Sequence, residues 1–229
     1  MYYYFDSTML LVLPGLLLAM WAQYRVKNAY REFSRVYSRS GLTGAEAARR
    51  ILDAAGLSDI RINRVSGELS DNFDPTKNEL NLSDGVYGST SISAIGVAAH
   101  ECGHAMQKSD GYAMLSMRSS IAPIVSIGSN LSWPIFLIGM IFSMRPLILA
   151  GIILFSLIVA FTLITLPVEF NASRRAVACI ETGGYLADDE IRGAKKVLNA
   201  AALTYVASAL NAILQLARLL LLSNRRGRD

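Results

Sequence analysis

Long apolar runs alternate with polar stretches along this chain. The runs cover residues 5–24, 121–142, 147–166 and 202–222. At 1.5 Å per helical residue, each can cross the hydrocarbon core of a bilayer, which is roughly 30 Å thick. The pattern predicts an integral membrane protein that is mainly α-helical, with about four transmembrane helices.

The flanks of the first run predict an uncleaved anchor and its orientation. Its N-terminal flank carries Asp6 and no Lys or Arg, so the basic start of a signal peptide is missing. Interfacial aromatic residues occur at both ends: Tyr2, Tyr3, Tyr4, Trp21 and Tyr24. The C-terminal flank is basic: Arg25, Lys27, Arg31, Arg35 and Arg39. By the positive-inside rule, the N-terminus lies outside and the following segment lies in the cytoplasm.

The last apolar run leaves two topologies open. If it crosses the membrane, the sequence Asn224-Arg225-Arg226-Gly227-Arg228 lies outside, against the positive-inside rule. If the run stays in the interface or in the bundle, these arginines remain inside. Gln215 and Arg218 within the run disfavour a crossing. We interpret the run as a fourth span.

Residues 25–118 have the pattern of a small α+β portion. Thr43 and Glu46 predict a capping box for a helix that ends at Gly56. The expected buried positions of this helix are Ala47, Ala48, Ile51, Leu52 and Ala55. From Ile60 to Leu82 the apolar period changes from 3.6 to 2, with turn-forming residues over 70–75. This predicts a small sheet with a hairpin whose last strand lies near Lys77–Ser83.

The predicted sheet has two interpretations. A strand directly before the helix described below could offer an exposed edge that binds an extended peptide by backbone pairing. A strand with a purely structural role explains the pattern equally well.

The two central apolar runs form a predicted transmembrane hairpin. Only the four residues 143–146 separate them. Ser126, Asn130 and Ser132 interrupt the first run and are expected to face other helices. Two crossings return the chain to the side that it left, so residues 167–201 lie on the same side as residues 25–118.

The composition agrees with a membrane protein and limits the classes of partner that are expected. Hydrophobic residues make up 52% of the chain, and the mean hydropathy is +0.35. The net charge of +4 comes from basic residues beside the apolar runs, which indicates contacts with the lipid bilayer. Nucleic acid is not expected as a partner, because aromatic residues are not interleaved with the basic ones. Cys102 and Cys179 are expected to be small buried residues without a disulfide, since both lie on the cytoplasmic side.

The candidate chemistry lies in the H-E-x-x-H motif formed by His100, Glu101 and His104, on a helix predicted over Ser91–Gln107. Residues four apart share a helix face, so both imidazoles are presented to one point. Two converging neutral imidazoles are zinc ligands, and Glu101 is placed to activate a water molecule on the metal. Gly103 leaves room for the metal or a second helix. One Zn²⁺ ion is the predicted cofactor.

Glu169 is the candidate third metal ligand. It follows the predicted hairpin directly, at the membrane boundary and on the side of the motif. A solvated interfacial Glu is the alternative. Four other acids compete with it, and their place after Gly183-Gly184 is typical of the acidic first turn of a helix. These acids are Glu181, Asp188, Asp189 and Glu190.

With these motifs the chain resembles the membrane-bound neutral zinc metallopeptidases of the YugP type. The resemblance covers nearly the whole chain. It is carried by residues 96–105 and 166–176, the Asp74-Pro75 turn, Leu82-Ser83 and Val86-Tyr87. It implies a gluzincin with a zincin-like portion, whose third zinc ligand is a Glu on a second helix, as Glu169 would be.

The HtpX and CAAX prenyl endopeptidases are more distantly similar. In those families an Asp follows the ligand Glu by four residues. This chain has Ser173 at that position. The hydrogen bond to a ligand histidine is therefore expected from Asn171 or Ser173.

Together these inferences predict a multi-pass protein of the cell (inner or plasma) membrane with a cytoplasmic active site. The expected parts are an N-terminal transmembrane anchor (1–24), a cytoplasmic zincin-like portion with the metal helix (25–118), a transmembrane hairpin (119–166), a cytoplasmic helix with the third ligand (167–201), and a C-terminal apolar helix with a basic tail (202–229).

The predicted reaction is hydrolysis of peptide bonds in a peptide or membrane-protein substrate. His100, His104 and Glu169 hold zinc, and Glu101 acts as the general base. The developing oxyanion also needs a donor. Arg174 and Arg175 are the candidates, with Tyr87 behind them, although one arginine could equally be an interfacial anchor.

Two other classes of protein compete with a peptidase. A zinc-stabilised scaffold or adaptor without turnover would not need Glu101, because structural zinc takes all four ligands from the protein. A small transporter is suggested by Asn130, Ser132 and Pro134 within one run. The absence of ionisable residues from that run argues against transport.

Overall fold

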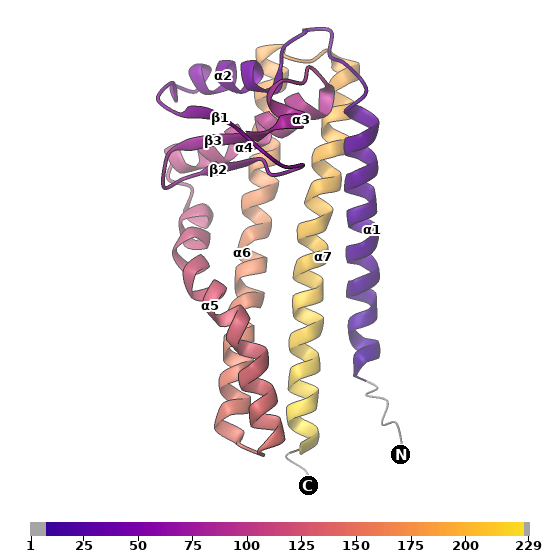
Figure 1. The fold of residues 1–229 in the computed structure, drawn as a ribbon, viewed down its shortest axis with the longest axis vertical. Helices are drawn as coiled ribbons and strands as arrows, with labels where there is room; N and C mark the ends of the chain where they lie inside the picture. Colours follow the sequence, from indigo (N-terminus) through magenta and orange to yellow (C-terminus); the bar gives the residue numbers. More distant parts are fainter. Residues whose placement is uncertain (1–7, 227–229) are drawn as a thin grey trace. The chain divides into compact units, whose positions relative to one another are not determined.

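The computed structural model describes residues 8–226. Residues 1–7 of the predicted anchor, including Asp6 and the three tyrosines, lie outside the described part, as do residues 227–229 of the basic tail. The elements in chain order are α1 (Met9–Phe33), α2 (Gly44–Ala54), β1 (Arg61–Val65), β2 (Asn72–Asp74), β3 (Glu79–Ser83), α3 (Asp84–Tyr87), α4 (Ile92–Ser109), α5 (Ala113–Ile141), α6 (Arg145–Gly183) and α7 (Asp188–Arg226) (Figure 1).

Four helices of the described chain are long and apolar enough to cross a membrane, namely α1, α5, α6 and α7. With the three-stranded sheet, they confirm the predicted fold class, a mainly α membrane protein with a small α+β portion. The chain divides into two compact units. The helical unit contains residues 8–22, 116–167 and 204–226, and the sheet unit contains residues 23–115 and 168–203.

Glycines set the packing inside the helical unit. A Cβ atom on Gly139 would lie 2.6 Å from the backbone nitrogen of Ile148, and one on Gly151 would lie 2.7 Å from the Cβ atom of Phe136. Helices α5 and α6 therefore approach more closely than larger residues would allow. Small residues at helix interfaces are the usual means of close packing in membranes. The predicted hairpin is thus tightly packed.

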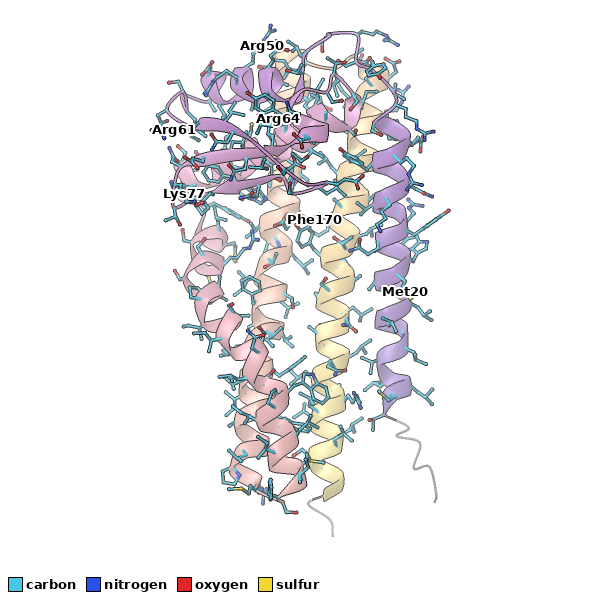
Figure 2. All side chains as sticks on the ribbon, in the orientation of Figure 1. Met20, Arg50, Arg61, Arg64, Lys77 and Phe170 are labelled. Carbon is cyan, nitrogen blue, oxygen red and sulfur yellow. The ribbon has the colours of Figure 1, made fainter. Side chains whose placement is uncertain are left out.

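The surface of the helical unit is apolar, as a lipid-facing surface requires. Met20 on α1 is 61% exposed and projects away from the helix (Figure 2). Of the three polar residues expected to face other helices, only Ser132 is buried. The prediction is wrong for Ser126 and Asn130, which are exposed. The Asn130 side chain donates to the carbonyl oxygen of Ser126, so its polar group is satisfied within its own helix.

The sheet unit contains a mixed sheet with strand order β1-β3-β2. Strands β1 and β3 are parallel, and β2 pairs antiparallel with β3, with Phe73 opposite Leu80. The turn between β2 and β3 is closed by the Asp74 carboxylate, which accepts hydrogen bonds from the backbone of Thr76 and Lys77. The predicted hairpin is therefore present, and its second strand is the central strand of the sheet.

Strand β2 lies within the stretch that the sequence predicted as a turn. Only Phe73 in this stretch is a large apolar residue, so no alternating pattern marks the strand. The strand forms because Phe73 packs into the core, and because the Asp71 carboxylate accepts hydrogen bonds from the backbone and hydroxyl of Ser83.

Helix α2 agrees with its predicted cap. The Thr43 side chain accepts from the backbone of Glu46, and the Glu46 carboxylate accepts from the backbone of Thr43. Four of the five predicted positions are buried, but Ala55 is exposed because it follows the last helical turn. Basic side chains cover the outside of the sheet unit, including Arg50, Arg61, Arg64 and Lys77 (Figure 2).

Helix α4 lies at the centre of the sheet unit and carries the motif. It starts at its N-cap Ser91, whose side chain accepts from the backbone of Ala94. A Cβ atom on Gly103 would lie only 2.6 Å from the carbonyl oxygen of Ala172 on α6. This confirms the prediction that Gly103 leaves room for a second helix. The close approach brings the motif next to the C-terminal part of α6.

Candidate metal centre

Two histidines on α4 and one glutamate on α6 converge in the sheet unit. The Nε2 atom of His100 lies 3.3 Å from Oε2 of Glu169, and the Nε2 atom of His104 lies 3.6 Å from the same oxygen. One nitrogen or oxygen atom from each of the three residues lies within 4.8 Å of the others. The Glu169 side chain is only 3% exposed, so the alternative of a solvated interfacial Glu does not hold.

The donor set fits a zinc ion. Two imidazole nitrogens and one carboxylate oxygen, with a further position for water, form a typical catalytic zinc site. Zinc–ligand distances of about 2.0–2.1 Å in tetrahedral geometry place the ligand atoms about 3.3–3.4 Å apart. The separations from Glu169 to the two histidines are close to this value. The Glu169 carboxylate is therefore placed to share a metal ion with each histidine.

A buried amide fixes the orientation of His104. Gln107 donates from Nε2 to the carbonyl oxygen of Val168 at 2.8 Å and to Oδ1 of Asn171 at 2.9 Å. Its Oε1 atom is therefore the one that faces Nδ1 of His104, at 3.0 Å. An oxygen acceptor requires the proton on Nδ1, which leaves the lone pair of the His104 imidazole on Nε2. That is the atom directed at Glu169.

The other histidine is held by a hydroxyl. Ser173 Oγ lies 3.2 Å from Nδ1 of His100. Ser173 occupies the position at which the distantly similar endopeptidases carry an Asp, and it was one of the two residues predicted for this contact. Asn171, the other predicted residue, does not contact a ligand histidine directly. It contacts Gln107, which in turn contacts His104. Partners of this kind orient metal ligands and tune their basicity.

Glu101 is buried beside the ligands and is held by the sheet. Its Oε2 atom accepts a hydrogen bond of 3.0 Å from the backbone nitrogen of Phe73 on β2. Strand β2 is an edge of the described sheet, and its Phe73 N–H is directed at α4 and not at β3. The strand directly before α4 is the central β3, so the prediction that this strand offers the free edge is wrong. The edge next to the motif belongs to β2.

The carboxylates make the centre negative. Burial of the His104 imidazole opposes its protonation, but the nearby carboxylates of Glu169 and Glu101 outweigh this and raise its pKa. The same carboxylates give the centre its negative character. Such a site attracts a divalent cation.

Neither candidate arginine makes a polar contact with His100, His104 or Glu169 among the described residues. Arg175 donates from Nε to Oδ1 of Asn171 and pairs through Nη1 with Asp110. Arg174 is exposed and makes no polar contact with a described residue. Tyr87 lines a cavity of about 690 Å³ between α2 and β1, and none of the ligand residues lines that cavity.

The competing acids have other roles. Glu181 pairs with Lys195 at 2.8 Å, and Asp189 pairs with Arg39 at 2.6 Å. Glu190 accepts from the backbone of Ala187, and with Asp188 and Asp189 it forms the acidic first turn of α7. Within the described chain, none of the four belongs to the ligand cluster.

Sequence reasoning missed Gln107 and the backbone of Phe73. Gln107 follows His104 by three residues on the same helix, so helical spacing could have indicated the contact. The identity of a residue does not indicate what its backbone N–H contacts. Its contribution is visible only once β2 and α4 are adjacent.

Four candidate membrane helices and a His/His/Glu cluster that could hold a metal ion indicate a membrane metalloprotein, and comparison with known proteins agrees. The chain belongs to the family described as "Putative neutral zinc metallopeptidase", which it matches over residues 8–224. It is 48% identical over 219 residues to "Putative membrane protease YugP" of Bacillus subtilis (strain 168), covering 96% of this chain and 97% of that protein. No solved structure matches the chain.

Family membership supports a proteolytic function and a membrane location in general terms. It also implies zinc as the metal, and the His100, His104 and Glu169 cluster is a possible site for it.

Proposed function

We propose that the protein is a membrane-embedded, zinc-dependent endopeptidase in which Glu101 is the general base. One observation carries the proposal. The buried Glu101 carboxylate is fixed by the Phe73 backbone beside three convergent ligand atoms, those of His100, His104 and Glu169. Structural zinc sites use four protein ligands and need no such base.

Metal binding and proton transfer are carried out by different residues. His100, His104 and Glu169 hold one Zn²⁺ ion. When bound, the ion polarises the scissile carbonyl and makes a water molecule more acidic. Glu101 accepts the proton of this water as it attacks the carbonyl carbon. Glu101 then delivers the proton to the leaving amine, and the C–N bond breaks.

The outer edge of β2 is the proposed substrate track. No described strand pairs with this edge, and the backbone of Phe73 on it is directed towards Glu101. A substrate in extended conformation could pair with this edge by backbone hydrogen bonds, with little dependence on side-chain identity. Peptides and extended segments of membrane proteins both meet this requirement.

Arg174 is the arginine that we propose for the oxyanion. Arg175 is engaged with Asn171 and Asp110, whereas Arg174 has an uncommitted guanidinium group among the described residues. Its side chain would have to swing towards the substrate. We also propose a cytoplasmic active site, because the basic segment that follows the first span, residues 25–39, favours the cytoplasmic side.

Chelator-sensitive proteolysis by the purified protein tests the proposal. In detergent, wild-type protein should cleave fluorescein-labelled casein, lose this activity with 1,10-phenanthroline, and regain it when zinc is added back. Glu169→Gln should lower the zinc content and the activity together, while the exposed control Glu181→Gln should leave both unchanged. A zinc-stabilised scaffold would keep its zinc and show no chelator-sensitive cleavage, and a transporter would need no tightly bound zinc.

A further inference from the structure

The helical unit contains a cavity of about 1260 Å³ that the proposed peptidase mechanism does not use. Its walls come from three of the candidate spans, α1, α6 and α7. This volume exceeds the roughly 300–1,000 Å³ of typical small-molecule sites. The cavity can therefore hold part of a large amphiphile.

The lining of the cavity is divided into a polar end and an apolar body. Ser143 and Arg145 stand at the turn between α5 and α6, and Ser223 and Asn224 stand near the end of α7. The apolar lining residues lie further along the same helices, and three of the leucines are about half exposed. They are Leu11, Ile148, Leu149, Ala217, Leu220 and Leu221.

Helical spacing shows that two of the three walls are each a single face of one helix. Ala217, Leu220, Leu221 and Asn224 follow the i, i+3, i+4, i+7 pattern of a single face of α7. Arg145, Ile148 and Leu149 share a face of α6 in the same way. In each helix the polar residue lies at the end and the apolar residues follow. The two faces thus provide a matching polar end and apolar wall.

Among the described residues, no acidic side chain pairs with the positive charge at the polar end. Arg145 is exposed and forms no ion pair with any described residue. No acidic side chain is among the residues that line the cavity. An arginine is well suited to bind phosphate, because its planar guanidinium group can donate two hydrogen bonds to two oxygens.

We propose that this cavity binds one anionic phospholipid, with its phosphate on Arg145 and an acyl chain along the leucines of α7. The lipid belongs to the leaflet at which α6 begins. The site is independent of the proposed peptidase function.

The proposal also accounts for the basic end of α7. This helix reaches Arg226, two residues beyond the cavity residue Asn224, and one further arginine, Arg228, follows in the sequence. If α7 crosses the membrane, these arginines lie on the side that the positive-inside rule disfavours. Anionic headgroups in that leaflet would offset the cost, because each basic residue near an anionic surface gains about 1 kcal/mol.

Native mass spectrometry of the full chain in detergent tests the site. The probes are phosphatidylglycerol and phosphatidylcholine with identical acyl chains. Wild-type protein should bind a first phosphatidylglycerol about fivefold more tightly than phosphatidylcholine, as expected for one favourable charge contact. Arg145→Gln should abolish this preference for the first lipid. Ala217→Phe should remove one bound lipid of either kind, because the ring fills the apolar wall.

Two controls separate this site from the other basic surfaces. Arg61→Gln, on β1, should leave lipid binding unchanged, and glycerol 3-phosphate should not compete because it lacks acyl chains. Equal affinity of wild-type protein for both lipids would overturn the proposal. An unchanged preference for phosphatidylglycerol in Arg145→Gln would also overturn the proposal, since Arg145 would then not bind the phosphate. An unchanged number of bound lipids in Ala217→Phe would overturn it as well, since no lipid would then occupy the apolar wall.

Discussion

Four side chains extend from the surface of the sheet unit to the ligand His104. Asp110 pairs with Arg175, which donates to Asn171, and the Asn171 oxygen also accepts from Gln107. Gln107 then holds the Nδ1 proton of His104. No buried side-chain nitrogen or oxygen atom of the described chain lacks a hydrogen-bond partner, and this includes the buried atoms of the path. Such fully satisfied networks rigidify a site.

Removing Gln107 should weaken metal binding. In Gln107→Ala the imidazole of His104 loses its acceptor and can rotate or change tautomer. Loss of partners of this kind lowers metal affinity by about 10–100-fold. Competition with a chromophoric chelator measures the zinc affinity directly. Ser109→Ala, an exposed change on the same helix, is the matched control, and an equal affinity of Gln107→Ala and this control would contradict the role.

Cys102 should be chemically inert despite its place inside the motif. Burial raises the pKa of its thiol well above the usual range, and its sulfur faces the carbonyl oxygen of Ala48 at 3.7 Å. The reactive thiolate is therefore scarce at any pH below that raised pKa. At pH 8, mass spectrometry should find maleimide on the half-buried Cys179 first and on Cys102 only after denaturation. Rapid labelling of Cys102 in the folded protein would disprove its burial.

At the residue scale, the sequence predicted the groups whose chemistry is distinctive. Two histidines four apart on a helix can share a face, and the hairpin indicated that Glu169 lies on their side of the membrane. The two arginines were less predictable, because a charged side chain next to a ligand helix has several partners within reach. Arg175 contacts Asn171 and Asp110, and neither of these two residues stands in a distinctive sequence pattern.

Among the elements, the contact between α4 and α6 is the one on which the metal centre depends. Gly103 lies opposite the carbonyl oxygen of Ala172, a backbone atom that cannot rotate away. Gly103→Ala should push the two helices apart, lower stability by about 1–3 kcal/mol, and weaken zinc binding. Thermal unfolding in detergent and the zinc affinity are the measurements.

Gly96 on the same helix supplies the control. A Cβ atom there would lie 3.4 Å from the Cβ atom of Ala194, which is an ordinary contact. Gly96→Ala should therefore be neutral or slightly stabilising, since Ala favours helix by up to about 1 kcal/mol over Gly. If both variants behave alike, the close approach at Gly103 has no special importance.

Strand β2 shows why one element escaped prediction. Three residues with a single buried side chain carry too little periodicity to be distinguished from a turn. The strand is specified by non-local contacts, namely the pairing of Phe73 with Leu80 and the hydrogen bond to Glu101. The capping box of α2, by contrast, is a local pattern and was predicted correctly.

For the whole molecule, the membrane topology is the feature with the clearest test. Four crossings with the N-terminus outside would place the C-terminus outside as well. In a bacterial host, alkaline phosphatase fused to the C-terminus should be active, and green fluorescent protein fused there should be dark. The reverse pattern would mean that α7 does not cross or that the orientation is inverted.

The overall class was predictable because long apolar segments report membrane crossing with little dependence on tertiary contacts. The four candidate helices contain the four predicted apolar runs, except for Phe142, which follows α5, and for residues 5–8 of the first run, which precede α1 in the sequence. The small sheet unit was harder to predict, since its strands are short and their order is set by packing against α4. Sequence alone could not assign β3 to the centre of the sheet.

The role of Glu101 is the central claim, and one pair of measurements tests it. Purified wild-type protein and Glu101→Gln are compared for zinc content by elemental analysis and for hydrolysis of labelled casein. The amide can still accept from the Phe73 N–H but cannot take a proton from water, so we predict equal zinc content and at least about a 100-fold loss of hydrolysis. Wild-type hydrolysis in a zinc-loaded Glu101→Gln variant would contradict the account.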